Sequence, residues 1–375
     1  MEEGKNNNVS PPFLRINPSK ILPLRILQFL LLLLAIGISF SFLSMFMIRY
    51  VGSSQITISS FTTPNSSSLP CFMKSPSSPS LMHDMNETEL FWRASMVPLI
   101  NQYPFARTKK IAFMFLTIGS LPMAPLWERF FNGHHKLYSI YIHSSPSYQH
   151  NFNSSSVFYK RKIPSQTVEW GTMSMCDAER RLLANALLDV SNEWFILLSE
   201  SCIPIQNFSS VYESLSRSNL SFMGSFDDPG ASGRGRYSWN MRPEVDISQW
   251  RKGSQWFEVE RRLAVHIISD SIYYRKFKEF CTPSCYVDEH YFQTMMSIQF
   301  PHLLANRTLT WVDWSRGGAH PATFGKEDIT AKLFEWILED HGCDLVGGLC
   351  FLFARKFAPD ALEPLLQISS EVFGF

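Results

Sequence analysis

Residues Asp177–Ser199, DAERRLLANALLDVSNEWFILLS, combine two secondary-structure patterns in one short stretch. Asp177–Val190 has acidic residues in its first turn and apolar residues along one face, which predicts an amphipathic helix. Glu193–Ser199 is a nearly continuous apolar run of strand length, typical of a strand that is buried on both faces. A helix that leads directly into a buried strand predicts an α/β domain.

The same alternation occurs upstream. Ile111–Thr117 (IAFMFLT) predicts a buried strand, Pro125–Phe131 the helix after it, and Leu137–His143 (LYSIYIH) a second strand that ends at a Ser-Ser-Pro turn. Strands and helices in this order predict a mainly parallel sheet, and such sheets bind ligands beyond the carboxyl ends of their strands. We therefore expect the functional site near His143–Pro146 and Ser199–Pro204.

An apolar segment precedes this domain. Ile26–Ile48 contains 23 residues without a charge, and as a helix it would reach roughly 34 Å, enough to cross a ~30 Å hydrocarbon core. It is long for a cleavable signal peptide, and no small-residue cleavage site follows it directly. Basic residues lie mainly on its N-terminal side, which predicts a cytoplasmic N-terminus: these are Lys5, Arg15, Lys20 and Arg25.

These features divide the chain into a cytoplasmic tail (1–25), a transmembrane signal anchor (26–48), a luminal stem (49–86) and a luminal catalytic domain (87–375). The stem is rich in Ser, Thr and Pro and cannot bury enough apolar surface to fold alone. A luminal domain predicts usable N-glycosylation sequons. Six are present, at Asn65, Asn86, Asn153, Asn207, Asn219 and Asn306.

Seven cysteines follow the apolar segment: Cys71, Cys176, Cys202, Cys281, Cys285, Cys343 and Cys350. An oxidising lumen permits disulfides, and an odd count leaves at least one thiol free or paired to a second chain, as in a homodimer. Cys281 and Cys285 could alternatively bind a metal, although no second pair with zinc-site spacing occurs.

Composition limits the classes of partner. The chain has 375 residues, of which 45% are hydrophobic, so it can bury a sizeable core in one large domain or at most two. Its net charge is +1, and outside the extreme N-terminus there is no long Lys/Arg run. Nucleic acid is therefore not an expected partner.

Several short motifs occur in a fixed order: Lys110–Leu116, Tyr141–His143, Trp170–Ser174, Leu198–Pro204, Asp288–Glu289, Trp314–Arg316 and Phe353–Phe357. Each motif is weak alone, but their order and spacing are specific. Together they resemble the core-2/I-branching β-1,6-N-acetylglucosaminyltransferase family, and most closely its plant branch of DUF266 or BC10-like proteins. The resemblance runs from about Lys110 to the C-terminus, roughly seven tenths of the chain.

The resemblance implies a GT-A-type fold, an inverting mechanism and independence from a divalent metal. A metal-dependent GT-A enzyme carries Asp-x-Asp after a core strand, where the two carboxylates hold Mn²⁺ or Mg²⁺ against the diphosphate. No Asp-x-Asp occurs in this sequence, and Ser199–Ser201 supplies a single carboxylate. Asp227–Asp228 and Glu258-x-Glu260 are weaker substitutes. We expect a UDP-sugar donor and neither a metal nor another cofactor.

A departing diphosphate without a metal needs positive side chains. Lys356 matches the family's diphosphate-binding Lys, and Arg355 stands beside it. Arg316 is the first choice for the family's companion Arg, with His320 in reserve. The alternative for Lys356 is a solvated surface cation.

An inverting transfer also needs a general base that takes the proton of the acceptor hydroxyl. The family's base is a Glu in a Pro-Asp-Glu-like motif, which reads Tyr286-Val-Asp-Glu-His290 here, so the resemblance assigns this role to Glu289. The alternative is that Asp288 and Glu289 only complement the N-terminus of a helix.

Two segments predict the acceptor side. The glycine-rich stretch 227–237 lacks the strand–loop–helix context of a phosphate-binding loop, so we expect a mobile acceptor loop with Arg234, Arg236 and Tyr237 binding sugar hydroxyls or acids. Trp256 lies in a segment that matches the family's acceptor side and could stack on a pyranose ring or simply pack in the core. In one departure, Ser144 and Ser145 stand where animal relatives carry an Asp near the nucleotide.

The sequence thus predicts a Golgi type II membrane glycosyltransferase that moves a sugar, N-acetylglucosamine first, from a UDP-sugar to a glycan or glycoprotein, affecting plant cell-wall components. One alternative is a UDP-glucuronic acid or UDP-xylose transferase acting on arabinogalactan or wall polysaccharide. Another is a non-catalytic, membrane-tethered glycan-binding protein. A secreted hydrolase is disfavoured, because no paired carboxylates or Ser-His-Asp order stand out.

Overall fold

The computed structural model describes residues 28, 31–41, 80–100, 103–339 and 350–375. The chain divides into two compact units, Met1–Pro70 and Cys71–Phe375. In the first unit, residues 31–41 are helical. None of the helices in the described part of the chain has the length and apolar character needed to span a membrane. The predicted cytoplasmic tail, both ends of the predicted span 26–48 and most of the predicted stem lie outside the described residues.

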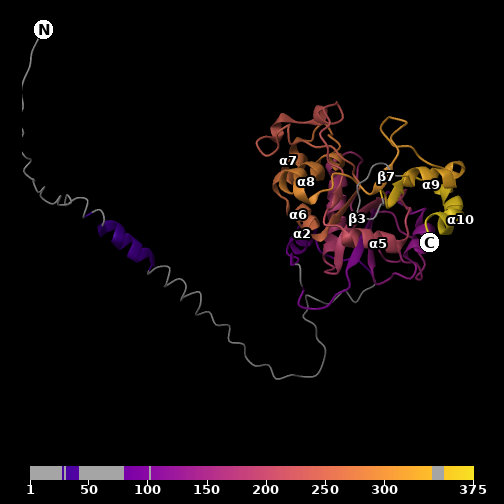
Figure 1. Cartoon of the computed structure of the whole chain (residues 1–375), viewed down its shortest axis with the longest axis horizontal. Coiled ribbons are helices and arrows are strands. Elements are labelled where there is room, and N and C mark those ends of the chain that lie inside the picture. The colour runs from indigo at the N-terminus through magenta and orange to yellow at the C-terminus, as the bar shows by residue number, and fades with distance from the viewer. Residues whose placement is uncertain (1–27, 29–30, 42–79, 101–102, 340–349) are drawn as a thin grey trace, which may run out of the picture. The chain divides into compact units, whose positions relative to one another are not determined.

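The second unit is a mixed α/β fold (Figure 1). Its strands are β1 (Lys110–Leu116), β2 (Tyr138–His143), β3 (Asn192–Ser199), β4 (Ile203–Pro204), β5 (Phe222–Met223), β6 (Phe257–Glu260), β7 (Thr310–Val312) and β8 (Phe353–Arg355). Its α-helices are α2 (Glu87–Ser95), α3 (Ala124–Phe131), α4 (Met173–Leu187), α5 (Phe208–Arg217), α6 (Arg261–Ser269), α7 (Ile272–Phe280), α8 (Tyr291–Gln299), α9 (Ala331–Leu338) and α10 (Leu362–Val372).

The main sheet has the strand order β2-β1-β3-β6-β5. Strand β1 pairs in parallel with β2 and β3, as the sequence predicts, whereas β6 is antiparallel to both β3 and β5. Four of the five strands of this sheet thus run in one direction, in agreement with the predicted mainly parallel sheet, and β6 runs in the opposite one. The physical reason is the connection between β5 and β6, a long loop without a crossover α-helix, which lets the strands run in opposite directions.

A second, smaller sheet has the order β4-β8-β7. Strand β8 is antiparallel to β4 and parallel to β7, with Ala354 opposite both Ile203 and Trp311. Because β4 follows β3 after only three residues, the small sheet lies next to the carboxyl end of β3. This arrangement brings the C-terminal segment, which contains Arg355 and Lys356, to the edge where the sequence predicts a site.

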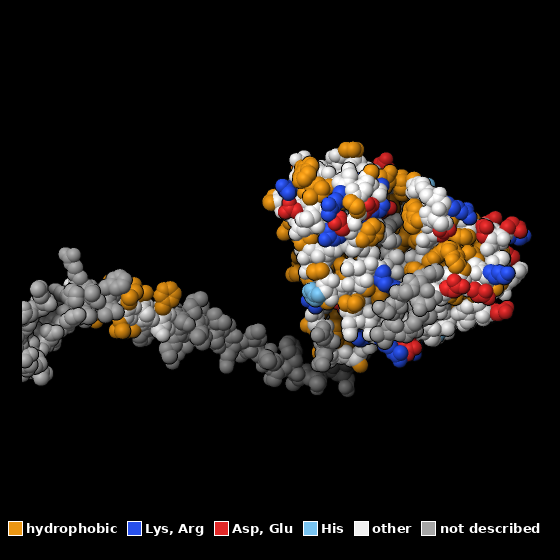
Figure 2. All heavy atoms as spheres, turned by 45° about the horizontal axis from the view of Figure 1, so that its top comes forward, with side chains coloured by type: hydrophobic (Ala, Val, Ile, Leu, Met, Phe, Trp, Pro, Cys, Tyr) orange, Lys and Arg blue, Asp and Glu red, His pale blue; other side chains and the backbone are white. Residues whose placement is uncertain are grey.

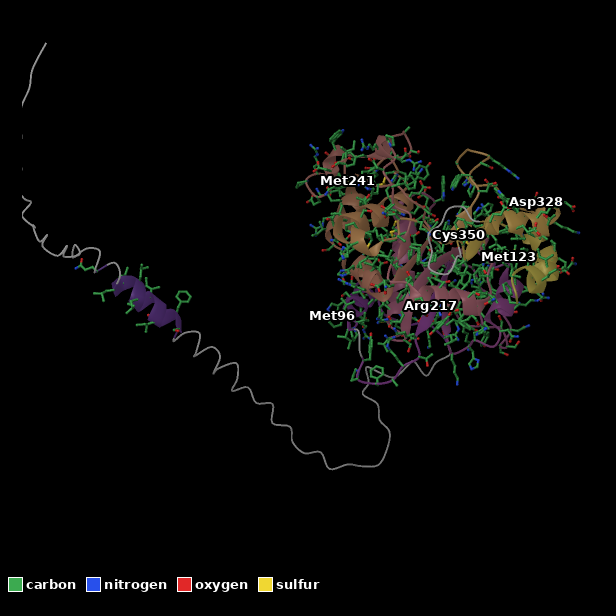
Figure 3. The ribbon with its side chains drawn as sticks, in the orientation of Figure 1. Met96, Met123, Arg217, Met241, Asp328 and Cys350 are labelled. Carbon is green, nitrogen blue, oxygen red and sulfur yellow. A yellow bond between two sulfur atoms is a disulfide. The ribbon has the colours of Figure 1, made fainter. Side chains whose placement is uncertain are left out.

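The strands of the main sheet separate two hydrophobic cores. Alternate side chains of β1, such as Met114 and Phe113, enter opposite cores, which explains why the strand reads as a continuous apolar run. Helices α2, α6, α7 and α8 lie on one side of the sheet, and α9 and α10 on the other (Figure 1). Figure 3 shows the same division, with Met241 of one core and Met123 of the other on opposite sides.

Helix α4 begins four residues before the predicted start at Asp177 and ends at Leu187. The two acidic residues that suggested a first turn have tertiary partners instead. Asp177 Oδ1 accepts a hydrogen bond from Tyr274 Oη at 2.8 Å, and Glu179 Oε1 accepts one from Gln255 Nε2 at 2.8 Å. These acids connect the helix to other elements rather than mark its N-terminus.

The folded unit extends N-terminal to Glu87. The Leu81 N–H donates to the carbonyl of Lys160, and the His83 ring shares a 2.9 Å hydrogen bond with Asn185 Oδ1. Part of the segment predicted as stem is thus attached to the α/β unit.

Cysteine pairing answers one question that the sequence left open. Cys281 and Cys285 form a disulfide and are therefore not a metal-binding pair. Cys176 and Cys202 are free and fully buried, so neither thiol can reach a second chain. Cys71 lies outside the described residues, and a homodimer through an unpaired cysteine stays a prediction.

The predicted sequons differ in accessibility. Asn207 is half-buried and caps α5, accepting a hydrogen bond from Ser210 N at 2.9 Å. Asn65 lies outside the described residues. The other four are exposed: Asn86, Asn153, Asn219 and Asn306.

Figure 2 shows Lys and Arg side chains interspersed with Asp and Glu side chains on the visible face of the molecule. No broad area of one charge sign is visible on that face.

Glu258 of β6 links the two sheets. Its Oε2 accepts a hydrogen bond from Leu309 N at 2.9 Å, and its Oε1 accepts one from Thr310 Oγ1 at 3.1 Å, at the start of β7. Burial raises the pKa of this carboxyl group from 4.5 to about 7, although both hydrogen bonds oppose the shift. Charging Glu258 therefore opposes folding.

This carboxyl group makes stability depend on pH in a defined direction. Its pKa is higher in the folded than in the unfolded chain, so its contribution is fully present below pH 4.5 and is lost as the pH rises through about 7. Relative to Glu258→Gln, the wild type should lose up to about 3 kcal/mol of unfolding free energy between pH 4.5 and 8. Urea unfolding of both full-length proteins at the two pH values measures this; an equal difference at both would contradict it.

Candidate active site

A cavity of about 1080 Å³ lies at the carboxyl ends of β1, β2 and β3. The residues that directly follow these strands line it, among them Thr117, Ser144 and Glu200. This is the edge of the sheet that the sequence predicts. The other walls come from the segment before α8 and from the loops of the small sheet.

Glu289 lies in a 3₁₀ turn, η4 (Val287–Glu289), which immediately precedes α8. Its backbone is fixed at both ends, because Glu289 N donates to Tyr286 O at 2.9 Å and Gly253 N donates to Glu289 O at 2.9 Å. A Cβ atom at Gly253 would lie 1.7 Å from the carbonyl oxygen of Gly224. The close backbone packing beside Glu289 therefore requires glycine at this position.

Two cations hold one carboxylate oxygen of Glu289. Oε2 lies 3.0 Å from Arg236 Nη1 and 3.5 Å from Lys252 Nζ, and all three side chains line the cavity. No described residue forms a hydrogen bond with Oε1. A carboxylate fixed through one oxygen, with the other unoccupied, can accept a proton from a hydroxyl group in the cavity.

The neighbouring acid, Asp288, has a different environment. It is 5% exposed, and its Oδ1 has no hydrogen-bond partner among the described residues. Burial and the charge of Glu289 raise the pKa of Asp288 to about 6. Behind it, burial and the charge of Asp288 raise the pKa of Glu179 well above its usual value. The two carboxyl groups of the Asp288–Glu289 motif thus face opposite electrostatic conditions.

Positive side chains reach the cavity from the small sheet. The ammonium group of Lys356 lines the cavity and has no ion-pair or hydrogen-bond partner in the described part of the chain. Arg355 is half-buried, and desolvation lowers its pKa, but a guanidinium group stays charged near neutral pH. An unpaired ammonium group in a cavity is suited to an anionic ligand.

Trp256 and Arg355 cover each other. The Arg355 Cζ atom lies 4.2 Å from the centroid of the Trp256 ring, and Trp256 is 5% exposed. Although Trp256 lines the cavity, one face of its indole is already in contact with the guanidinium group. Core packing and support for Arg355 describe its contacts better than an open stacking surface.

The remaining predicted residues are distributed unevenly. His320 lines the cavity and its ring lies 5.2 Å from that of Trp170, whereas Arg316 is exposed and does not line the cavity. Arg234 forms an exposed ion pair with Asp227. Neither it nor Tyr237 lines the cavity.

The polar contacts of Tyr237 are directed away from the cavity. Its hydroxyl donates to Val245 O at 2.6 Å, and its ring packs edge-on against Trp239 and Trp250. Of the three side chains predicted to bind the acceptor from this loop, Arg236 is thus the one that reaches the cavity, where Ser232 of the same loop also forms part of the wall.

Comparison with known proteins shows the family of this chain. The family model for the Core-2/I-Branching enzyme matches residues 111–338. The chain belongs to this family. It is also 32% identical over 308 residues to "Glycosyltransferase BC10" from Oryza sativa subsp. japonica, covering 69% of this chain and 76% of that protein. The core-2/I-branching chain is therefore a glycosyltransferase, which implies a nucleotide-sugar donor and a glycan acceptor for its cavity.

Three cavity residues of this core-2/I-branching enzyme had no assigned role in the sequence analysis. Trp170, Trp314 and Phe226 line the cavity, and their side chains are 53%, 50% and 53% exposed. Exposed aromatic rings can stack on the apolar faces of pyranose rings. Trp170 and Trp314 both lie in the family motifs, so their positions could have been found from the sequence, but their exposure could not.

The end of β2 forms another part of the wall. Burial lowers the pKa of His143 to about 3, and the charges of Arg181 and Lys162 add to the shift, so its imidazole is neutral. Gln166 N donates to His143 Nε2 at 3.3 Å, which places the ring proton on Nδ1. Together with Ser144, this side chain offers neutral polar groups rather than a carboxylate.

The unpaired state of Lys356 yields a direct prediction. Lys356→Ala should weaken binding of UDP, the nucleotide expected from the sequence, by roughly 10- to 100-fold, because a charge-assisted contact contributes about 1.5–3 kcal/mol. Isothermal titration calorimetry measures the change. Lys326→Ala is the matched control, since Lys326 is exposed and outside the cavity. A Kd for Lys356→Ala within twofold of the control would rule out this role.

Proposed function

We propose that this glycosyltransferase moves a sugar from a UDP-sugar to a glycan or glycoprotein acceptor with inversion, and that it does so on a GT-A-type fold without a divalent metal. N-acetylglucosamine is the first candidate sugar. One observation carries the proposal: the same cavity is lined both by Glu289, held through Oε2, and by Lys356, a cation with no ion-pair partner among the residues that the structure describes. A negative carboxylate can accept the proton of the acceptor hydroxyl, and a positive ammonium group can bind the departing diphosphate.

In the proposed reaction, the acceptor hydroxyl oxygen attacks the anomeric carbon from the face opposite the diphosphate. The new carbon–oxygen bond forms while the bond from the anomeric carbon to the diphosphate oxygen breaks. Glu289 Oε1 takes the hydroxyl proton, and UDP leaves with the electron pair of the broken bond. Arg236 and Lys252 keep Glu289 in place during this step.

Lys356 neutralises the charge that develops on the departing diphosphate. Arg355, the half-buried neighbouring residue whose guanidinium group stacks on Trp256, adds a second fixed positive charge to the cavity. Support for metal independence comes from the loop after β3, which contributes only the carboxylate of Glu200 to the cavity, and from the absence of Asp-x-Asp in the sequence.

The exposed rings of Trp170, Trp314 and Phe226 provide the acceptor surface. They are large enough to contact more than one pyranose unit, which favours an oligosaccharide or polysaccharide over a monosaccharide acceptor. The alternative donor UDP-glucuronic acid gains no added support, because the two arginines that would bind its carboxylate are paired with Glu289 and Asp227.

We also propose that the enzyme is a Golgi type II membrane glycoprotein. The apolar segment 26–48, the basic residues before it and the six sequons support this topology. Four of these sequons are exposed in the α/β unit, as glycosylation requires.

The role of Glu289 has a simple test. Glu289→Gln keeps the size and most contacts of the side chain but cannot accept the proton, so kcat should fall by about 10²- to 10⁴-fold while UDP binding persists. Transfer assays and calorimetry on the same preparations measure both. Glu279→Gln is the control, since Glu279 is an exposed acid of α7. Activity of Glu289→Gln within a few-fold of this control would rule out Glu289 as the general base.

The donor can be identified by thermal shift on the full-length protein in the presence of EDTA. A UDP-sugar that binds only the folded state stabilises it by about 2.7 kcal/mol at a concentration 100 times its Kd. UDP-N-acetylglucosamine should raise Tm more than UDP-glucuronic acid or UDP-xylose. A rise that requires added Mn²⁺ or Mg²⁺ would contradict the metal-independent mechanism.

A further inference from the structure

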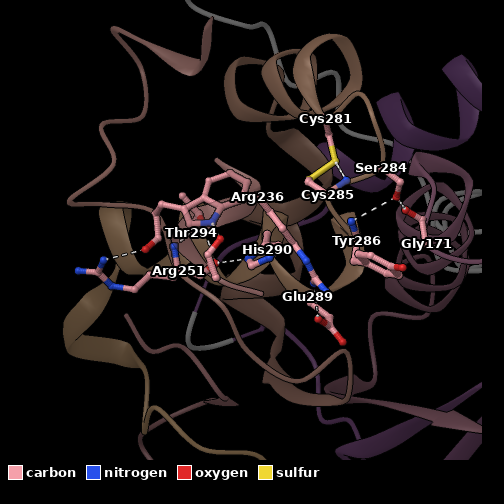
Figure 4. Close-up of a disulfide and its surroundings, with 12 residues drawn as sticks. Gly171, Arg236, Arg251, Cys281, Ser284, Cys285, Tyr286, Glu289, His290 and Thr294 are labelled. Atoms are coloured by element: carbon pink, nitrogen blue, oxygen red, sulfur yellow. Dashed lines mark hydrogen bonds and ion pairs between the residues drawn. A yellow bond between two sulfur atoms is a disulfide. The ribbon is translucent and has the colours of Figure 1, made fainter. Parts of the chain in front are cut away.

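Tyr286 lies between the Cys281–Cys285 disulfide and Glu289 (Figure 4). Its backbone is left-handed, with φ 57° and ψ 71°, a conformation that side chains with a Cβ atom rarely adopt. The contacts around it hold this conformation. Its carbonyl accepts the 2.9 Å hydrogen bond from Glu289 N, and its N–H donates to Ser284 Oγ at 3.3 Å.

The segment before Tyr286 is attached at two points. The disulfide closes a loop of five residues that ends directly before Tyr286. Within this loop, the Ser284 hydroxyl donates a short hydrogen bond to the carbonyl of Gly171, in the turn that precedes α4. This hydrogen bond therefore connects the loop to the turn before α4, a separate part of the cavity wall.

The ring of Tyr286 packs on the same turn. A Cβ atom at Gly171 would lie 3.1 Å from Tyr286 Cδ1 and 3.2 Å from Cε1, so only glycine lets the ring approach this closely. Trp170 contacts the ring edge-on, with 5.0 Å between the centroids. The ring thus has little freedom to move.

The same ring supports the cation that holds Glu289. Arg236 Cζ lies 4.1 Å from the centroid of the Tyr286 ring, and Arg236 Nη1 lies 3.0 Å from Glu289 Oε2. Figure 4 shows the Arg236 side chain extending to Glu289 with the Tyr286 ring beside it. A guanidinium group that stacks on an aromatic ring loses much of its rotational freedom, which fixes the direction of its N–H groups.

We infer that Tyr286 is a positioning residue for Glu289. It acts through two connections, a backbone hydrogen bond that sets the turn and a ring that orients Arg236. Together they keep Oε2 engaged and leave Oε1 facing the acceptor. This inference rests on the proposed role of Glu289 as the general base.

The test separates the ring from the hydroxyl group and from overall stability. Tyr286→Leu retains bulk but removes the π face that Arg236 stacks on. Because misplacing a reacting group by about 1 Å can cost about 100-fold in rate, kcat should fall by roughly 10- to 100-fold. The KM for the donor should change by less than about threefold, since Lys356 lies on a different element. Tyr286→Phe keeps the ring and should recover most of kcat.

Matched controls exclude a general folding defect. Tyr212→Leu removes a half-buried tyrosine of α5 outside the cavity and should leave kcat unchanged. Thiol titration should show the Cys281–Cys285 bond intact in every variant. If Tyr286→Leu does not fold, Arg236→Lys replaces it, because lysine keeps the charge but lacks the planar group; the same selective loss of kcat is expected.

A double-mutant cycle distinguishes failure of this inference from failure of the proposed function. In a Glu289→Gln background nothing remains to be positioned, so adding Tyr286→Leu should lower kcat by less than about twofold. An active Glu289→Gln enzyme would overturn the proposed function. An inactive Glu289→Gln enzyme together with a Tyr286→Leu enzyme of wild-type kcat, or a further tenfold loss in the double variant, would overturn the positioning role alone.

Discussion

The burial of both faces of β1 and β3 is the constraint on which the rest of the molecule depends. Each strand must send its side chains alternately into two separate cores, so neither can shift its register by one residue without exchanging the two sets. The fixed register determines the residue at which each strand leaves the sheet. The chain can leave the sheet only at those ends, where the backbone meets water and polar side chains become possible. The position of the cavity is therefore a result of how the apolar residues are distributed.

Charge is divided within the cavity in a way that suits its proposed chemistry. Two cations converge on a single carboxylate oxygen of Glu289. Lys356, which also lines the cavity, has no anionic partner among the described residues and is available to a ligand. Asp288 does not join either group, because its burial opposes ionisation. Because some cations hold the carboxylate and another is available to a ligand, one cavity can both fix a proton acceptor and bind an anion.

The central strands and the position of the cavity could be predicted from the sequence, for identifiable reasons. The strands β1, β2 and β3 were predicted within a residue or so at each end, because apolar runs of that length have few other uses in a soluble domain. The cavity edge followed from the order of those strands.

What the sequence could not supply was long-range contact. The alternation of Phe257–Glu260 permits a strand but does not reveal its antiparallel partners, and the acids of α4 resemble a helix start although Tyr274 and Gln255 bind them. For the same reason, the sequence could not show which arginine of the predicted acceptor loop reaches the cavity. Arg234 and Arg236 have similar sequence surroundings, but each forms an ion pair with a different acid.

Gly171 and Gly253 contribute to the site because they lack a side chain, which lets other groups pack closely against them. Neither carries a functional group, yet the ring of Tyr286 packs against one and the carbonyl of Gly224 against the other. In genetic terms, a substitution at either position should lower activity, because an added Cβ atom would lie 1.7 Å from the Gly224 carbonyl oxygen at Gly253 and 3.1 Å from the Tyr286 ring at Gly171. The number of ways to inactivate this enzyme by a single inherited change is therefore larger than the number of groups that touch its substrates.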